Sequence, residues 1–375
     1  MKARFSTALQ VGFIAALIAA VAGMAVTARD NLLRQNIATG FAFLRDRTGW
    51  DVGASFLSQS AADPYWWTFL VGLVNTLVLS FVCIVAATAL GLAFALVGSG
   101  RSRIPHALTR AYVWVFRNIP LIVQVFFWYH VTRSLPPVRQ AIEFFGCCFA
   151  SNRGIYVPHV GVSGTAFDAW LVLIAGVAAA VIMASIRRKQ IATGKATFGW
   201  IAITAAAAGA ALLMGAIRLR IDVTTPHLQG FNFVEGTYLS PEFAALVIAI
   251  VAYNIAFVAE IVNSGIRAVP RSQLEAARII GLSDARIFWK ITVPQAIRVA
   301  VPPLVNQYIS ITKSSSLAIV IGYTDLFSVG AIAINHTGQS LDVIAVLMLV
   351  YLAISTAISA VGNAYNRAIT NRGIR

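Results

Sequence analysis

Charged residues are scarce in this chain. Asp, Glu, Lys and Arg make up 11% of its 375 residues, whereas 58% of the residues are hydrophobic. Soluble domains carry about 25% charged residues, and a single soluble core stops growing at roughly 250–300 residues. The shortage of charge therefore excludes a soluble globular protein and indicates a polytopic membrane protein.

Cysteine is also scarce, with three residues in the whole chain. Cys83 lies in an apolar run, and Cys147 and Cys148 are adjacent, where cysteines rarely pair with each other. The spacing of Cys and His that binds metals is missing. We therefore expect no metal site and read the cysteines as small packing residues. An unusual redox role is left open at Cys147 and Cys148.

Three motifs that would indicate catalysis are missing as well. The chain has no Gly-x-x-x-x-Gly-Lys-Ser/Thr phosphate-binding loop, no Gly-x-Ser-x-Gly and no His-Glu-x-x-His. These sequences mark nucleotide hydrolysis, nucleophilic hydrolysis and zinc proteolysis, respectively. We therefore predict that the chain is not an enzyme, has no cofactor of its own and cannot act as an ATPase.

Long apolar runs are what the chain has instead. A helix needs roughly 20 apolar residues to cross a bilayer. About eight stretches qualify, near 9–27, 67–98, 110–133, 168–186, 198–217, 243–264, 295–313 and 341–361. The first is read as a retained span rather than a cleaved signal peptide, and the third is interrupted at Arg117-Asn118-Ile119-Pro120. These runs predict an all-α fold, a transmembrane bundle of about eight helices.

The distribution of positive charge predicts the orientation of this bundle. With the N-terminus in the cytoplasm, most of the 29 lysines and arginines fall in inner segments, as the positive-inside rule requires. An even number of spans then places the C-terminus in the cytoplasm too. The formal net charge of +15 therefore reflects orientation and contact with anionic lipid, not binding of nucleic acid.

The polar loop between the sixth and seventh spans, residues 265–294, is predicted to lie on the cytoplasmic face. Ser272 and Glu275 fit a capping box at the start of a short helix, and Gly281 fits its end. Ser283 suits the start of a second helix over 284–292, and Pro294 suits the first turn of the next span. Two short helices with a bend are equally compatible with a docking surface and with an interfacial hairpin.

This loop resembles a motif of bacterial ABC importer permeases. Their pattern is Glu-Ala-Ala, three residues, Gly, nine residues, Ile, one residue, Leu-Pro; here Val293 replaces the leucine. The resemblance implies that the first short helix is a coupling helix that docks on an ATPase subunit. The coupling residues it implies are Glu275, Ala276, Ala277, Gly281, Leu282, Ile291 and Pro294.

Other stretches resemble the polar amino-acid branch of the same family, among them VFRNIPLIVQVFFWY (115–129) and TKSSSLAIVIG (312–322). The family more often has Arg at Asn263 and Asn at Ser314. The chain is similar to the larger permease of general L-amino acid transporters. The resemblance implies four regions: 1–66, an N-terminal span and outer segment; 67–133, the first part of the permease core; 134–240, an insert with two extra spans; and 241–375, the second part of the core.

The function implied by the resemblance is that of a permease subunit with a type I importer core, which moves polar or general L-amino acids across the bacterial inner membrane by alternating access. Two cytosolic ATPase subunits would bind ATP, a periplasmic binding protein would deliver the amino acid, and a second homologous permease would complete a heterodimer. A homodimer is left open. The alternatives are a secondary transporter or channel and a membrane scaffold. A secondary transporter needs ionisable groups at mid-membrane, and this chain has few of them.

Polar residues within the predicted spans are the candidates for the substrate path. Such residues usually hydrogen-bond between helices, but a path for zwitterions also needs them. The candidates are Gln124, Asn306, Lys313 and Ser315. Glu260, near the inner end of the sixth span, is predicted to pair with a basic residue such as Arg267.

Overall fold

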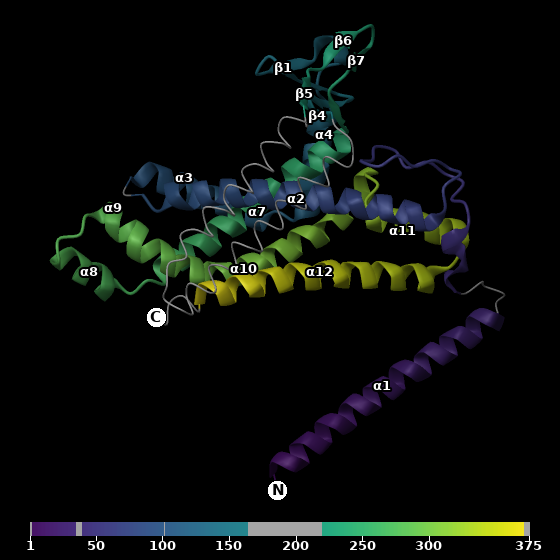
Figure 1. The fold of residues 1–375 in the computed structure, drawn as a ribbon, viewed down its shortest axis with the longest axis horizontal. Coiled ribbons are helices and arrows are strands. Elements are labelled where there is room, and N and C mark those ends of the chain that lie inside the picture. The colour runs from purple at the N-terminus through teal and green to yellow at the C-terminus, as the bar shows by residue number, and fades with distance from the viewer. Residues whose placement is uncertain (1, 35–39, 101, 164–219, 371–375) are drawn as a thin grey trace, which may run out of the picture. The chain divides into compact units, whose positions relative to one another are not determined.

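A computed structural model describes residues 2–34, 40–100, 102–163 and 220–370. The chain divides into two compact units, of which one comprises Met1–Thr132 with Pro241–Arg375 and the other Arg133–Ser240. The first unit is helical, and the second contains the strands (Figure 1). The predicted spans at 168–186 and 198–217 lie outside the described residues.

Thirteen helical elements form the first unit in its described part. The long ones are α1 (Lys2–Arg34), α2 (Tyr65–Gly98), α3 (Arg103–Asn118), α4 (Leu121–Arg133), α7 (Pro241–Arg267), α10 (Val293–Ser314), α11 (Leu326–Thr337) and α12 (Ser340–Thr370). The short ones are η1 (Phe41–Arg45), α8 (Arg271–Ile279), α9 (Asp284–Ile287) and η4 (Ser315–Ile321), and a π-helical stretch η3 (Phe288–Thr292) joins α9 to α10.

Three described helices, α2, α7 and α12, are long and apolar enough to cross a membrane. Two bent pairs raise the number to five if each pair forms one span: α3 with α4, bent by 102°, and Asp284–Ile321 with α11, bent by 49°. The apolar part of α1 covers Gly12–Met24, which is shorter than the predicted run. The described residues thus support three to five of the eight predicted spans.

The bend between α3 and α4 lies where the sequence predicts an interruption. Pro120 has no backbone N–H and disfavours helical backbone in the residue before it. Ile119 accordingly adopts an extended conformation, with φ −90° and ψ 122°. The helix nevertheless begins at Arg103, seven residues earlier than the predicted start of the third span.

The core of the first unit forms where α7 packs against α2, α3 and α10, and α10 packs against α12 (Figure 1). Gly91 lets α2 approach α7 closely, because an added Cβ would lie 2.6 Å from Val258. Polar pairs also join the helices: Gln307 donates to Asn254 at 2.6 Å. Small residues and side-chain hydrogen bonds are the usual means of packing helices in membranes.

The second unit is built from short strands. A four-stranded antiparallel sheet has the order β1 (Ile142–Phe144), β2 (Cys148–Ser151), β3 (Gly154–Val157), β8 (Thr237–Leu239). Two-stranded sheets pair β4 (His159–Ser163) with β5 (Arg220–Thr224) and β6 (His227–Gln229) with β7 (Asn232–Val234). The chain is mostly helical, but the all-α expectation is wrong for this unit. Strands of three to five residues are too short to register in a search for 20-residue apolar runs.

Candidate functional site

The loop between α7 and α10 forms a helical hairpin. Helix α8 ends at Ile279, and Gly281, directly after the C-cap Ile280, has φ +81°. The N–H of Gly281 donates to the carbonyl of Arg278 at 2.9 Å, and the N–H of Leu282 donates to that of Ala277 at 3.1 Å. These two bonds form a Schellman motif, which satisfies the last carbonyls of the helix. The predicted stop at Gly281 is confirmed.

Two details of this loop differ from the prediction. Pro270 occupies the position before α8, so Ser272 lies inside the first turn, and the helix has no side-chain cap hydrogen bond. The predicted capping box is therefore wrong. The second helix begins after Ser283 as expected, but it continues through the π-helical stretch into α10 instead of ending at Thr292. Pro294 lies in the first turn of α10.

The hairpin exposes apolar side chains next to charged ones. Ile279 and Ile280 are 86% and 75% exposed, and Trp289 is 65% exposed. Glu275 and Ala276 are exposed, whereas Ala277 is buried and Leu282 and Ile291 are half-buried. Exposed apolar groups gathered on one segment indicate a binding surface. The hairpin therefore has the properties of a docking element.

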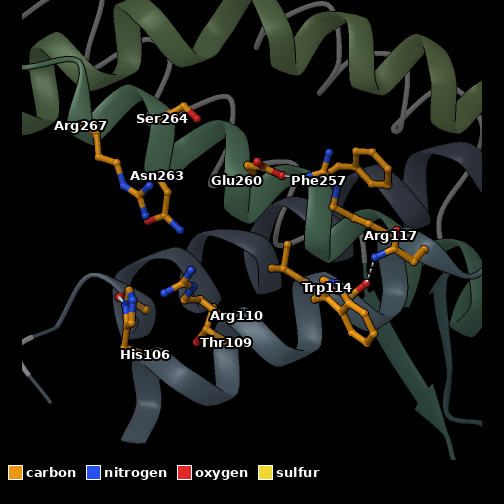
Figure 2. Close-up of a pocket in the computed structure, with 13 residues that line it drawn as sticks. His106, Thr109, Arg110, Trp114, Arg117, Phe257, Glu260, Asn263, Ser264 and Arg267 are labelled. Atoms are coloured by element: carbon orange, nitrogen blue, oxygen red, sulfur yellow. Dashed lines mark hydrogen bonds and ion pairs between the residues drawn. The ribbon is translucent and has the colours of Figure 1, made fainter. Parts of the chain in front are cut away.

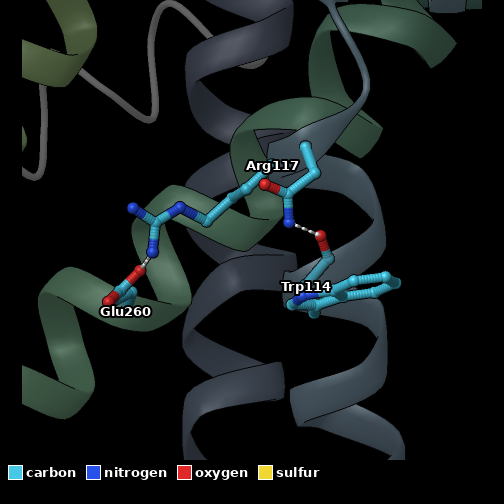
Figure 3. Close-up of polar contacts among 4 residues, drawn as sticks. Trp114, Arg117 and Glu260 are labelled. Atoms are coloured by element: carbon cyan, nitrogen blue, oxygen red, sulfur yellow. Dashed lines mark hydrogen bonds and ion pairs between the residues drawn. The ribbon is translucent and has the colours of Figure 1, made fainter.

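A polar pocket lies at the α3–α7 contact, with a volume of about 630 Å³ (Figure 2). Arg117 from α3 forms an ion pair with Glu260 from α7 (Figure 3). The guanidinium carbon of Arg117 also lies 5.1 Å from the centre of the Phe257 ring, a distance at which cation–π attraction acts. The pair thus joins two helices and lines a cavity.

The predicted partner of Glu260, Arg267, is replaced by Arg117. Arg267 lies seven residues further along the same helix, about 10 Å along its axis. Both residues line the pocket, but the carboxylate of Glu260 meets the guanidinium that comes from α3. A contact between helices that are distant in sequence depends on packing, which a single sequence does not reveal.

The four candidates for the substrate path lie apart from this pocket, since none of them is among its lining residues. Gln124 is buried, and its amide donates to the carbonyls of Phe116 and Ile119, each at 3.1 Å. It therefore satisfies backbone groups that the break after α3 leaves open. Asn306 and Lys313 are exposed on α10.

Ser315 contacts a buried carboxylate that the sequence analysis missed. Asp325 is fully buried, and its Oδ1 accepts from the backbone N–H and the hydroxyl of Ser328, at 2.9 and 2.8 Å. Its Oδ2 accepts from the hydroxyl of Ser315 at 3.3 Å. Asp325 is thus the N-cap of α11. The signal was an Asp directly before an apolar run, in a segment that had been taken for an outer loop.

Cys148 is the first residue of β2 and Cys147 directly precedes it, with their Sγ atoms 3.8 Å apart and no disulfide between them. Within the described part of the chain, no group of three His, Cys, Asp or Glu residues is arranged to hold a metal ion. The loop hairpin offers an exposed surface, and the α3–α7 pocket offers a polar cavity.

Comparison with known proteins places the chain. Residues 87–373 match the model of the family described as binding-protein-dependent transport system inner membrane component. The chain belongs to this family. The match includes the hairpin and both helices of the polar pocket, so the two sites are part of the family's shared region.

Three relatives cover nearly the whole chain. The putative amino-acid ABC transporter permease protein YhdX of Escherichia coli (strain K12) is 40% identical and covers 96% of this chain and 93% of its own length. The general L-amino acid transport system permease protein AapQ of Rhizobium johnstonii is 36% identical, over 95% and 90%. The glutamate/glutamine/aspartate/asparagine transport system permease protein BztB of Rhodobacter capsulatus is 31% identical, over 97% and 93%.

Proposed function

We propose that this chain is the transmembrane permease subunit of an ATP-driven ABC importer, which moves polar or general L-amino acids across the bacterial inner membrane by alternating access. The hairpin between α7 and α10 carries the proposal, because it combines a docking surface with direct chain connections to two core helices. The substrate class is supported by the relatives, whose names specify amino acids.

In the proposed mechanism, the hairpin receives the motion of an ATPase subunit. Helix α8 follows α7, and α9 continues through η3 into α10 without a break. A push on the hairpin would therefore act on both core helices. The contact would involve Glu275 and Ala276 on the exposed side, with Ala277, Gly281, Leu282, Ile291 and Pro294 giving the hairpin its shape.

The proposed assembly contains two ATPase subunits in the cytosol, a periplasmic amino-acid-binding protein and a second, homologous permease. ATP would bind the ATPase subunits and not this chain. ATP shifts the transporter between its inward- and outward-facing states only if it binds one of them more tightly. Both termini and the hairpin lie on the cytoplasmic side in this proposal. The permease core comprises 67–133 and 241–375, and 134–240 is an insert.

The test replaces the exposed carboxylate of the hairpin. Glu275→Ala should leave the chain inserted and assembled but lower ATP-driven amino-acid uptake into proteoliposomes at least about tenfold, as expected for loss of a charge-assisted contact at an interface. Ser272→Ala is the matched control, since Ser272 is exposed on the same helix and makes no cap bond. It should transport like the unchanged protein.

A secondary transporter would behave differently in the same assay. It would take up amino acids along an ion gradient without ATP, and Glu275→Ala would leave the uptake rate unchanged. Full ATP-driven uptake by an assembled Glu275→Ala transporter would show that this residue does not couple the subunits.

A further inference from the structure

Arg117 and Glu260 contact each other, and both side chains also line the open pocket. The side chain of Arg117 is 40% exposed and that of Glu260 is 48% exposed. Figure 2 shows Glu260 between Arg117 and the part of α7 that carries Asn263, Ser264 and Arg267. A pair that served only to tie α3 to α7 would gain strength from exclusion of water, but this pair remains accessible.

The pair lies near the ends of two helices of the bundle and lines a cavity. Glu260 lies seven residues before the end of α7, and Arg117 lies next to the last residue of α3. Seven residues of helix correspond to about 10 Å. Charged side chains within membrane bundles usually face a water-filled cavity or the interior of the bundle, and they mark substrate pathways. The cavity beside the pair is therefore a candidate passage for a transported molecule.

The chemistry of the pair matches the part that all amino acids share. A free amino acid carries a carboxylate and an ammonium group on one carbon. A guanidinium binds carboxylate through two parallel hydrogen bonds, and a carboxylate accepts hydrogen bonds from an ammonium group. A zwitterion that enters the pair satisfies both protein charges and leaves the net charge of the site unchanged.

The remaining lining residues add a preference among side chains. The pocket is lined by three arginines, Arg110, Arg117 and Arg267, against one carboxylate. Its volume of about 630 Å³ is within the roughly 300–1,000 Å³ of small-molecule sites. The excess of positive charge favours acidic and neutral side chains and disfavours basic ones.

We propose that Arg117 binds the α-carboxylate and Glu260 the α-ammonium group of the transported amino acid, in a site that prefers acidic and neutral side chains. This inference rests on the proposed function, and it adds to it a substrate site and a substrate class.

The test measures equilibrium binding to the purified transporter without ATP and without its binding protein. The probes are radiolabelled L-glutamine and two unlabelled competitors, 4-aminobutanamide, which lacks the carboxylate, and N-acetyl-L-glutamine, which lacks the ammonium group. Arg117→Gln should weaken L-glutamine binding about 10-fold to 100-fold while the affinity of 4-aminobutanamide stays the same. Glu260→Gln should weaken L-glutamine binding similarly and leave N-acetyl-L-glutamine unaffected.

Another exposed ion pair provides the control. Glu235 pairs with His227 at 3.7 Å in the second unit, and Glu235→Gln removes that pair without touching a residue that lines the pocket. It should leave all three affinities unchanged. With the unchanged protein, L-lysine should displace radiolabelled L-glutamine less well than L-glutamate does.

Several results would overturn the proposal. If Arg117→Gln weakened all three ligands equally, the pair would be a structural tie, and if it weakened none, the site would lie elsewhere. The same charges suit the head group of phosphatidylethanolamine, so a short-chain form is included. Binding of this lipid, with no binding of any of the twenty amino acids, would assign the pocket to lipid.

ATP-driven uptake by the unchanged protein, measured in the same preparation, separates this proposal from the proposed function. Uptake that persists at the full rate in Arg117→Gln would refute the substrate site alone. A preparation that contains no ATPase and shows no ATP-driven uptake would refute the proposed function.

Discussion

Gly281 shows how one residue sets the shape of the proposed coupling hairpin. Its φ of +81° lies in the left-handed region, and nothing lies within 4 Å of the place that a Cβ would occupy. The constraint is therefore conformational rather than steric. An L-residue in this region costs roughly 1–2 kcal/mol relative to glycine, and asparagine costs less than other residues.

We therefore expect Gly281→Ala to destabilise the hairpin by about 1 kcal/mol and to lower ATP-driven uptake, with Gly281→Asn between it and the unchanged protein. Hydrogen exchange of the amides of 271–294 measures the first effect, and uptake into proteoliposomes measures the second. Gly53→Ala is the control, because that glycine also has open space around it but no positive φ. Equal exchange in the alanine and glycine proteins would show that the turn does not require the left-handed backbone.

At the scale of single elements, the sequence predicted the long apolar helices and the helix break at a proline. Helices α2, α7 and α12 follow from apolar runs, and the ends of α3 and α4 follow from Pro120, because these signals act locally. The strands of the second unit were missed, since each has only three to five residues. The turn Phe145-Gly146, which joins the paired strands β1 and β2, has positive φ at both residues, and its glycine was the available signal for a hairpin.

The candidate sites divide in the same way. The bend at Gly281 could be predicted because a glycine at a helix end has a local cause. The pairing of Arg117 with Glu260 could not, because it depends on how α3 packs against α7. Gln124 is predicted as a substrate contact because a path for zwitterions needs polar groups within the spans. The structure gives a second reason for a polar residue there. The break between α3 and α4 leaves backbone carbonyls without helical donors, and the amide of Gln124 donates to two of them.

The joint between α3 and α4 accordingly yields a prediction about stability. Gln124→Leu should lower the melting temperature of the detergent-solubilised protein, because two partly buried hydrogen bonds to backbone carbonyls are lost, at about 0.5–1.5 kcal/mol each. Asn118→Ala is the matched control. Its amide also donates to a carbonyl, that of Trp114 at 2.6 Å, but this bond is exposed, so water replaces it at little cost. Equal melting temperatures for Gln124→Leu and the unchanged protein would show that the carbonyls find other donors.

At the scale of the whole molecule, the charges of the α3–α7 pocket bear on the assembly. Exposed arginines and a carboxylate on helices of a membrane bundle are unfavourable against lipid. A second permease that faces this surface would enclose the pocket as a water-filled cavity between two chains. In the proposed importer, a partner permease would therefore keep these charges out of contact with lipid.

We expect gentle purification of this chain from its native membrane to yield a complex with one copy of the chain, one copy of a homologous permease and two ATPase subunits. Native mass spectrometry measures the stoichiometry, and ATP hydrolysis should rise when the amino-acid-binding protein is added. Two copies of this chain in the complex would replace the heterodimer with a homodimer and leave the importer intact. A stable complex that transports amino acids without any ATPase would instead favour a secondary carrier, and the hairpin at 275–294 would then bind a different protein.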